Sequence, residues 1–419
     1  MPINSFLYPG AKVVPPFTVA NSIRLNQGDD PDMKKTIGAP TSNRKFSVSC
    51  WVKLSNLGVQ RNLWGLGATS GATGLSVRFQ DDDTLDFFDY NGSGNTFGYS
   101  TNQVFRDVSA WSHFLFAVDT EQSTAHNRVR IYHNGVEIEK TNLTDNPGDP
   151  SEDANLTIAD GHTFKVGDDN AGANEWAGYI TEVVYIDGTA LDQSSFGQFD
   201  SDSPNIWKPI DVSGLTFGTN GFYLDFEDSS NLGNDANGGT DLTETNIQSL
   251  DQSTDTCTNN FCTWNPLIVR LGRTQPTFSE GNLKCQHNDT GGNTPSWGTF
   301  LLNSGKWYWE VKITSAGIVY CGVWQPGYNN GDVDDALNGI VVYRTDGNKQ
   351  AETAATAASY GDSFTTGDII GVAVDVDTGT IWFSKNGTWQ NSATISEIGA
   401  GTTTNSAYTG KSFATNGIL

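Results

Sequence analysis

The sequence predicts an all-β protein made of two tandem antiparallel β-sandwiches. Short segments that alternate apolar and polar residues recur roughly every 8–12 residues between turns rich in Gly, Asn and Asp, a pattern typical of sandwiches. The chain has 46 glycines, only two methionines and 11% aromatic residues, which disfavours both a helical bundle and disorder. At ~150 residues per domain, 419 residues correspond to two or three domains.

The charge of the chain excludes some classes of partner. The 24 Lys and Arg residues against 48 Asp and Glu residues give a net charge of −24, which repels a phosphate backbone, so we expect no nucleic-acid binding. No apolar stretch reaches about 18 residues, so we expect no membrane insertion. The odd number of cysteines, five, favours reduced thiols in a cytoplasmic product. Whether Cys257 and Cys262 pair stays open.

The N-terminal segment, residues 1–17, is predicted to be an extended attachment arm. It is apolar, yet Pro2, Pro9, Pro15 and Pro16 fix the backbone and remove hydrogen-bond donors, so neither a helix nor a central strand fits. It has no basic residue before position 12 and no unbroken apolar core, unlike a secretory signal peptide. We therefore expect the arm to dock on another protein.

The first sandwich is predicted over residues 18–227. Clear period-2 strands lie at residues 46–53, 111–118, 128–133 and 179–186. Asn134-Gly135 between two strands predicts a tight hairpin, because both residues tolerate positive φ. Only residues 189–199 and 351–359 have the propensity to form helices, and both segments are short.

A change of composition separates the two sandwiches. Residues 228–258 consist almost entirely of Asp, Ser, Asn, Gly and Thr, which predicts a linker over residues 228–262. Strand patterns resume in residues 263–419, where Lys306–Ile313 alternates aromatic and aliphatic residues and is expected to bury Trp307 and Trp309. Further strands and tight turns follow between residues 368 and 387, which predicts a second β-meander.

Both halves resemble known families. Residues 18–227 resemble the concanavalin A-like, laminin-G-like jelly rolls, on the basis of residues 43–53, 111–118, 130–136 and 178–188. Residues 263–415 resemble a SPRY domain, and the segments that carry this similarity are residues 305–313, 320–324 and 371–387. The second similarity is the more specific, since several strands and turns agree in order.

Two joining segments point to a biological context. Residues 218–226 and 259–266 are similar to segments of tailed-phage virion proteins, especially of aquatic phages. The resemblance implies a virion structural protein, either a tail fibre or a capsid decoration protein, assembled in the host cytoplasm. It also implies contacts with other virion proteins through the N-terminal arm, a host-surface glycan or protein as ligand, and a homo-oligomer.

Catalysis is not expected. Glycanases with this jelly roll place acids on one face of a strand, about 5 Å apart in retaining enzymes. Asp225 and Glu227 share a face, but Tyr223 stands where the family pattern wants a third acid, and Glu182 and Asp187 point to opposite faces. We therefore predict a non-enzymatic adhesion protein. A polysaccharide depolymerase and a purely structural cement protein are the alternatives.

Two acidic pairs are candidates for a structural Ca²⁺. Asp81 and Asp83 lie in one predicted loop and Asp168 and Asp169 in another, and hard carboxylate oxygens are what Ca²⁺ prefers. The resemblance supports this, since laminin-G-like domains often hold calcium at the loop rim. Neither pair has EF-hand spacing, so solvated turns are the alternative, and no cofactor is required.

Four aromatic residues are candidates for sugar binding. Trp64 precedes a glycine in a predicted turn, Tyr90 follows the acidic run, and Trp324 and Tyr328 flank a predicted SPRY loop. Aromatic faces surrounded by Asp and Asn suit sugars, which expose C–H faces and hydroxyl groups. Burial in the core is the alternative for each.

Overall fold

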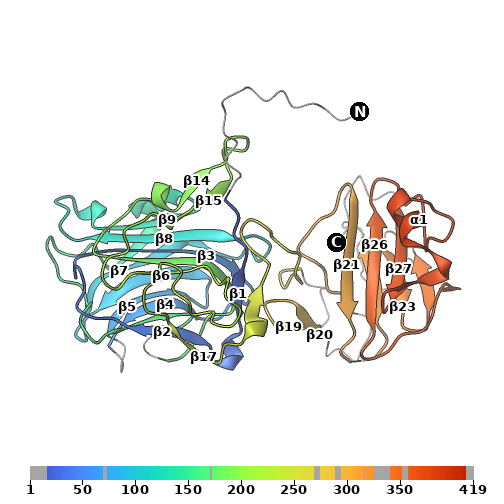
Figure 1. Cartoon of the computed structure of the whole chain (residues 1–419), viewed down its shortest axis with the longest axis horizontal. Coiled ribbons are helices and arrows are strands. Elements are labelled where there is room, and N and C mark those ends of the chain that lie inside the picture. Colours follow the sequence, from blue (N-terminus) through green and yellow to red (C-terminus); the bar gives the residue numbers. More distant parts are fainter. Residues whose placement is uncertain are drawn as a thin grey trace. The chain divides into compact units, whose positions relative to one another are not determined.

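The computed structural model describes residues 17–68, 73–169, 172–268, 274–287, 294–315, 317–324, 340–351 and 357–411. The attachment arm predicted over residues 1–17 therefore lies almost wholly outside the described residues. The chain forms two compact units, one of residues 1–261 with 279–281 and one of residues 262–278 with 282–419 (Figure 1). The prediction of an all-β fold is confirmed, because each unit holds its core between antiparallel sheets.

The first unit is a sandwich of two large sheets. Sheet A has the order β10-β9-β8-β3-β13-β1-β18, with β16 paired to β13. Its strands are β10 (Val136–Glu137), β9 (Val129–His133), β8 (Ser112–Asp119), β3 (Lys45–Leu54), β13 (Gly178–Asp187), β1 (Ser22–Leu25), β18 (Gln252–Ser253) and β16 (Phe222–Leu224). The predicted hairpin is present, since Asn134 and Gly135 both adopt positive φ between β9 and β10.

Sheet B lies against sheet A. Its order is β11-β7-β6-β5-β4-β12-β2-β17. Its strands are β11 (Leu143–Gly148), β7 (Asn95–Val104), β6 (Thr84–Tyr90), β5 (Gly74–Phe79), β4 (Arg61–Gly67), β12 (Thr163–Val166), β2 (Asp32–Thr36) and β17 (Thr243–Thr245).

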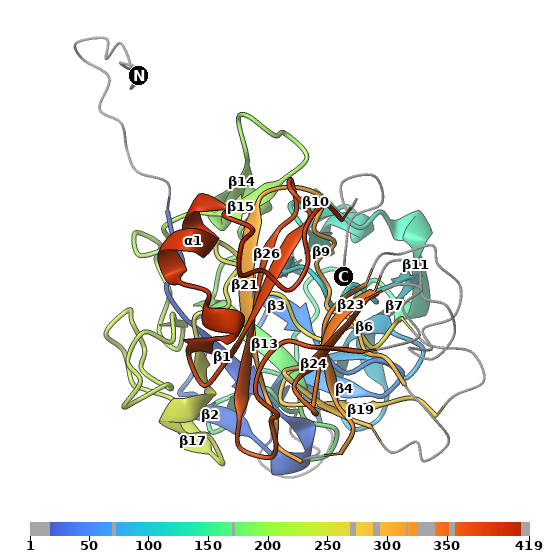
Figure 2. The ribbon, with the colours of Figure 1, turned by 90° about the vertical axis from the view of Figure 1, so that its right-hand side faces the viewer.

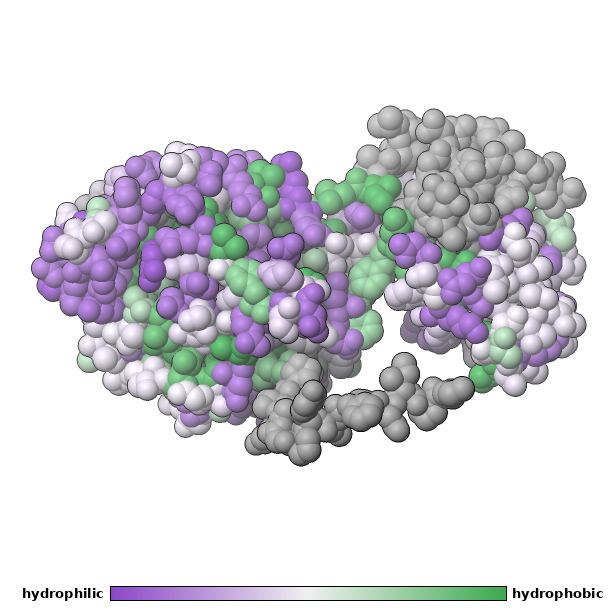
Figure 3. Space-filling model, turned by 90° about the horizontal axis from the view of Figure 1, so that it is seen from above, coloured by the Kyte–Doolittle hydropathy of each residue, from purple (hydrophilic) through white to green (hydrophobic). Residues whose placement is uncertain are grey.

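Period-2 patterning builds the core between the two sheets. Along β3, Phe46, Val48, Cys50 and Val52 all join this core and are at most 1% exposed. The opposite face of sheet A is not open to solvent either, because residues of the 189–217 segment pack on it in a second apolar cluster. This second layer explains why every residue of β13 is buried. Hydrophilic residues dominate the face of this unit seen in Figure 3.

Residues 228–258 are part of the first unit and not a linker, which corrects the prediction. Strands β17 and β18 lie in this segment and extend the two sheets by pairing with β2 and β1. Leu232 and Leu242 are each 2% exposed and belong to the main core. Two apolar anchors, the two strand pairings and a buried ion pair of Asp255 dock the segment, and its polar composition did not reveal them.

The predicted helices also differ from the structure. Residues 189–199 contain a short 3₁₀ helix (Gln193–Ser195) and β14 (Gly197–Phe199), which pairs with β15 (Trp207–Pro209). Residues 352–356 lie outside the described part. The α-helix found in the described residues is α1 (Ile395–Ala400), where Thr394 and Glu397 form a capping box that the sequence reasoning passed over. None of the described helices is long and apolar enough to cross a membrane.

The second unit contains two smaller sheets around its own core. One has the order β21-β26-β27-β28 and the other β22-β23-β24-β25, and Figure 2 shows β21 beside β26. The strands are β21 (Lys306–Lys312), β26 (Ile369–Asp375), β27 (Thr380–Lys385), β28 (Thr388–Trp389), β22 (Tyr320–Trp324), β23 (Ile340–Arg344), β24 (Asn348–Ala351) and β25 (Ala358–Ser359), with a separate hairpin of β19 (Thr277–Ser279) and β20 (Lys284–Gln286).

One aromatic prediction in this unit is wrong. Trp309 packs against the core, as predicted, but Trp307 is 42% exposed. Both indoles project from the same side of β21, but Trp307 lies two residues closer to the beginning of the strand. There its Nε1 donates to the Ser304 carbonyl, 2.7 Å away. Position at the strand end, and not periodicity, decides its exposure.

Candidate ligand-binding site

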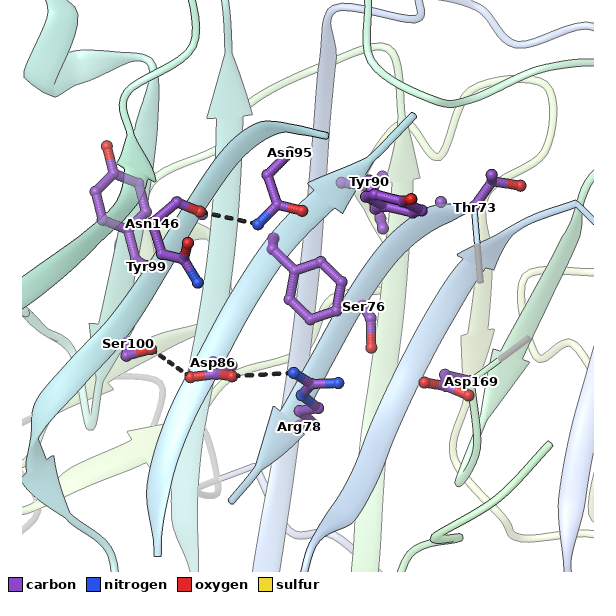
Figure 4. A pocket seen from close by; sticks show the side chains of 14 residues that line it. Thr73, Ser76, Arg78, Asp86, Tyr90, Asn95, Tyr99, Ser100, Asn146 and Asp169 are labelled. Carbon is purple, nitrogen blue, oxygen red and sulfur yellow. Dashed lines mark hydrogen bonds and ion pairs between the residues drawn. The ribbon is translucent and has the colours of Figure 1, made fainter. Parts of the chain in front are cut away.

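A hollow lies on the outer face of sheet B. It has a volume of about 230 Å³. Strands β5, β6 and β7 form its floor, because their inward residues fill the core while the alternate residues face outward. On β5, for example, Val77 and Phe79 are core residues, whereas Ser76 and Arg78 line the hollow (Figure 4).

An ion pair orders the centre of the hollow. Asp86 of β6 accepts from the Arg78 guanidinium at 3.4 Å and from the Ser100 hydroxyl at 2.5 Å, and it also accepts from Gln80. The Arg78 guanidinium lies over the Phe88 ring, 4.8 Å from its centroid. These contacts place the guanidinium between Asp86 and the Phe88 ring.

Two buried polar atoms of the hollow have no hydrogen-bond partner in the described structure. They are Ser76 Oγ and Arg78 Nε. Ser76 is only 5% exposed. Because an unsatisfied buried donor or acceptor costs roughly 1–3 kcal/mol, these two atoms are a local cost of the fold beneath the hollow, and neither is exposed to a ligand in it.

The walls of the hollow come from segments distant in sequence. Asn95 of β7 donates to the Asn146 carbonyl at 2.9 Å, and Tyr90 stands at the end of β6 (Figure 4). Asp169, 9% exposed, lies above β4. Gly65 allows this approach, since a Cβ at that position would lie 2.9 Å from the Asp169 Cα. Aromatic faces, a carboxylate and amides thus surround one concave surface.

The structure separates the four predicted aromatic residues. Tyr90 lines the hollow. Trp64 does not: it is 1% exposed and stacks on Phe164 in the core, with ring centroids 5.6 Å apart, because it occupies an inward position of β4. Trp324 ends β22 in the second unit and packs on Trp297, with centroids 5.1 Å apart. Tyr328 lies outside the described residues.

The hollow contains residues that sequence reasoning missed. Ser76, Arg78 and Asp86 are ordinary polar positions of alternating strands, and Asn146 belongs to a strand far along the chain. Their alternation predicted only that they face away from the core. The pairing of β5, β6, β7 and β11 brings them together, and no local motif encodes it.

Of the four predicted calcium ligands, Asp83 and Asp168 form ion pairs with basic side chains, and Asp81 and Asp169 do not join them in one cluster. Asp83 is buried and contacts Arg61 at 3.3 Å and Arg106 at 2.8 Å, while Asp81 is exposed. Asp168 contacts Lys165 at 2.6 Å, and Asp169 lines the hollow. Within the described ranges, no group of three or more His, Cys, Asp or Glu residues is arranged to hold a metal ion.

Of the acidic residues considered for catalysis, Glu182 forms a buried contact with Tyr223. Glu182 lies at a bulge of β13 with φ of 52°, and the Tyr223 hydroxyl donates to its Oε2 at 2.7 Å. Burial, with smaller contributions from Asp225 and Glu227, raises the pKa of Glu182 to about 8. The pairing of β13 with β16 thus brings Glu182 and Tyr223 together, a contact that spacing along the chain did not reveal.

Comparison with known proteins supports the two domain assignments. Residues 29–195 match the family described as the concanavalin A-like lectin/glucanases superfamily, and residues 306–402 match the SPRY domain. The predicted resemblance to these two families is therefore confirmed, although the matched segments are shorter than the predicted domains.

Several solved structures are similar to the chain. A heptameric SAP-like pentraxin from Limulus polyphemus is 16% identical, with a TM-score of 0.29, over 41% of this chain and 76% of that one. A putative carbohydrate binding protein from Bacteroides ovatus is 15% identical, with a TM-score of 0.35, over 55% of this chain and 59% of that one. Domains LG4-5 of the mouse laminin α1 chain are 10% identical, with a TM-score of 0.33, over 98% of this chain and 84% of that one.

Proposed function

We propose that this chain is a non-enzymatic adhesion protein that binds a host-surface glycan in the hollow on sheet B. The observation that carries the proposal is the hollow itself, which offers Phe88 and Tyr90 beside the ion pair of Arg78 and Asp86. Sugars present apolar C–H faces and hydroxyl groups that both donate and accept, so they match this combination. The match of residues 29–195 to a lectin-containing superfamily supports the same class of ligand.

The charges favour an uncharged glycan. Asp86 and Asp169 line the hollow against the single cation Arg78, which Asp86 already neutralises. The whole chain carries a net charge of −24, which further disfavours an acidic sugar. A hollow of this size buries little area, so single-site affinity should be on the order of millimolar, and many copies on one particle would supply avidity.

A glycan array probed with the full chain tests this proposal. We expect weak binding to neutral host-surface glycans, reduced at least about tenfold by Tyr90→Ala through the loss of an aromatic contact. The matched control is Tyr308→Ala, which removes a 53% exposed tyrosine from the second unit and should leave binding unchanged. Equal binding by the two variants would exclude the hollow as the site.

The biological setting is also part of the proposal. We place the chain in the virion of a tailed phage, as a tail-fibre or capsid-surface protein that homo-oligomerises and contacts other virion proteins through residues 1–17. Electron microscopy of particles labelled with antibody to this chain tests the location. Removal of residues 1–17 should leave a folded protein that no longer enters virions, and normal incorporation would move the attachment site elsewhere.

The alternatives make different predictions. A depolymerase would release reducing ends from host polysaccharide, and substitution of Asp225 or Glu227 would abolish the release, whereas the adhesion proposal expects no release. Glu182 is an unsuitable acid–base partner because it is 6% exposed, and a substrate could hardly reach it. Absence of both glycan binding and cleavage across host-surface extracts would favour a structural cement protein.

A further inference from the structure

Three donor groups meet in the second unit, in one small cluster outside both the hollow and the aromatic candidates. Cys285 belongs to β20, and His287 follows directly after the strand ends at Gln286. Ser296 approaches from a separate segment. Cys285 Sγ lies 3.5 Å from His287 Nε2 and 3.0 Å from Ser296 Oγ, and Ser296 Oγ lies 3.4 Å from His287 Nε2.

Backbone hydrogen bonds fix the two segments that carry these donors. Residues 263–265 run between them: the Trp264 amide donates to the Asn282 carbonyl at 2.9 Å, just before β20. On the other side, the Asn265 amide donates to the Trp297 carbonyl at 2.8 Å. Trp297 itself is only 6% exposed, so Ser296 is attached to an anchored residue. The cluster is therefore held by the fold of the second unit.

Hydrogen bonds within the cluster cannot occupy all three edges of this triangle. The thiol and the hydroxyl have one proton each, and Nε2 either accepts or donates but cannot do both. In either histidine tautomer, protons can occupy at most two of the three edges. Among the described residues, the hydrogen bonds of the three groups join them only to one another. One close edge of the cluster is therefore left without a bonding proton.

Two of the three edges of the cluster fit a tetrahedral metal ion. Zinc lies about 2.3 Å from sulfur, about 2.0–2.1 Å from nitrogen and about 2.0–2.2 Å from oxygen. Tetrahedral geometry then separates the sulfur and nitrogen ligands by about 3.5 Å and the nitrogen and oxygen ligands by about 3.4 Å. Two observed edges, 3.5 Å and 3.4 Å, match these spans. The third edge, 3.0 Å between Sγ and Oγ, would have to open by roughly half an ångström.

We propose that Cys285, His287 and Ser296 form a binding site for a zinc-class divalent ion. The three side chains supply three of the four ligands of a tetrahedral site. Thiolate and imidazole are the ligands that borderline-soft ions such as Zn²⁺ select. Binding requires the Cys285 thiol to release its proton to solvent as the sulfur–metal bond forms. His287 is exposed, so the fourth position faces solvent and takes a water or an exchangeable ligand.

The same cluster does not suit a nucleophilic dyad. Burial raises the pKa of the Cys285 thiol, and partial desolvation lowers the pKa of His287, whose ring still reaches solvent, so the neutral pair predominates near pH 7. A nucleophilic cysteine requires the opposite shift, because the thiolate is the reactive form. Metal binding also needs the thiolate, but the ion itself displaces the thiol proton as the sulfur–metal bond forms, and the neutral imidazole ligates without losing a proton.

Titration of the full chain with Co²⁺ and Zn²⁺ tests the site. We expect a thiolate-to-cobalt charge-transfer band in the near ultraviolet, removed by Zn²⁺. Cys285→Ser and His287→Gln should each lower Zn²⁺ affinity at least about tenfold, since even loss of a supporting residue costs that much. The matched control is Cys262→Ser, which removes an exposed cysteine of the same unit and should leave the band unchanged. A band that survives in Cys285→Ser, or no band in the natural chain, would overturn the proposal.

A second measurement protects the test from a variant that fails to fold. Alkylation of the natural full chain, followed by mass spectrometry of each cysteine, reports directly on the thiols. We expect Zn²⁺ to slow the modification of Cys285 and to leave that of Cys262 unchanged. Equal rates at Cys285 with and without Zn²⁺ would contradict the proposal.

Discussion

Lys53 and Asp255 form a buried ion pair between residues 202 positions apart. Lys53 Nζ lies 2.8 Å from Asp255 Oδ2 and also donates to Asn260 Oδ1 and the Phe261 carbonyl. The other oxygen of Asp255 accepts from the Trp111 indole at 2.9 Å. Because both charges are fully hydrogen-bonded, the pair anchors residues 254–261 on the outer face of sheet A.

Removal of Asp255 should destabilise the first unit strongly. Asp255→Ala leaves the Lys53 ammonium, 0% exposed, without its counter-ion, and such a break typically costs about 3–5 kcal/mol. Urea unfolding measures the loss. The control is Glu121→Ala, whose carboxylate is 2.7 Å from Lys45 but 41% exposed and should contribute less than about 1 kcal/mol. Similar losses for the two variants would contradict the anchoring role.

Truncation should distinguish a packed segment from a linker. A chain of residues 17–261 retains β17, β18 and Asp255, and we expect it to fold. A chain of residues 17–227 loses these elements together with Leu232 and Leu242, so it exposes part of the core and should aggregate or unfold. Circular dichroism and gel filtration check both chains. Two equally stable fragments would restore the linker interpretation.

Acid should destabilise the first unit through His113. Burial lowers the pKa of His113 from 6.5 to about 3, and the Trp207 indole donates to its Nδ1 at 3.1 Å, which leaves no room for a second ring proton. The folded state therefore binds fewer protons than the unfolded state below pH 6.5, and stability falls as the pH drops from 6.5 toward 3. His113→Gln should flatten this slope in unfolding free energies measured across the range.

A rise in pH should destabilise the first unit through Glu182. Its pKa is raised from 4.5 to about 8, so the folded state binds more protons between these values and stability falls as the pH rises through this window. The Tyr223 hydroxyl donates to this carboxyl group, and the charges of Asp225, Glu227 and Asp211 raise its pKa further. Glu182→Gln keeps the acceptor for Tyr223 and should gain stability relative to the natural chain with rising pH. A difference independent of pH would show that Glu182 does not titrate in this window.

Calcium should have no measurable effect on thermal stability. Arg61 and Arg106 neutralise Asp83, and Lys165 occupies the position beside Asp168 that a cation would take. Differential scanning calorimetry in excess Ca²⁺ and in chelator should give the same transition. A calcium-dependent rise that disappears in Asp168→Asn would revive the calcium site predicted from the sequence.

The sequence by itself determined the strands and the hairpin, through the alternation of apolar residues and the residue types at the turn. Phe46, Val48, Cys50 and Val52 face the core because a strand repeats every two residues, and Asn134-Gly135 forms a hairpin because both residues accept positive φ. Tertiary packing alone decided which faces remain open. Trp64 is in the core although it precedes a glycine, and Trp307 is exposed although its strand alternates well.

Long-range pairing decided the rest. Asp255 lies in the most polar stretch of the chain, yet Lys53 and Trp111 bury it, and no local pattern identifies those partners. The hollow likewise combines Ser76 and Asp86, from strands that follow one another in the sequence, with Asn146, from a strand much later in the chain. Composition and periodicity describe each segment on its own, whereas burial, ion pairing and a concave site depend on which segments the folded sheets bring into contact.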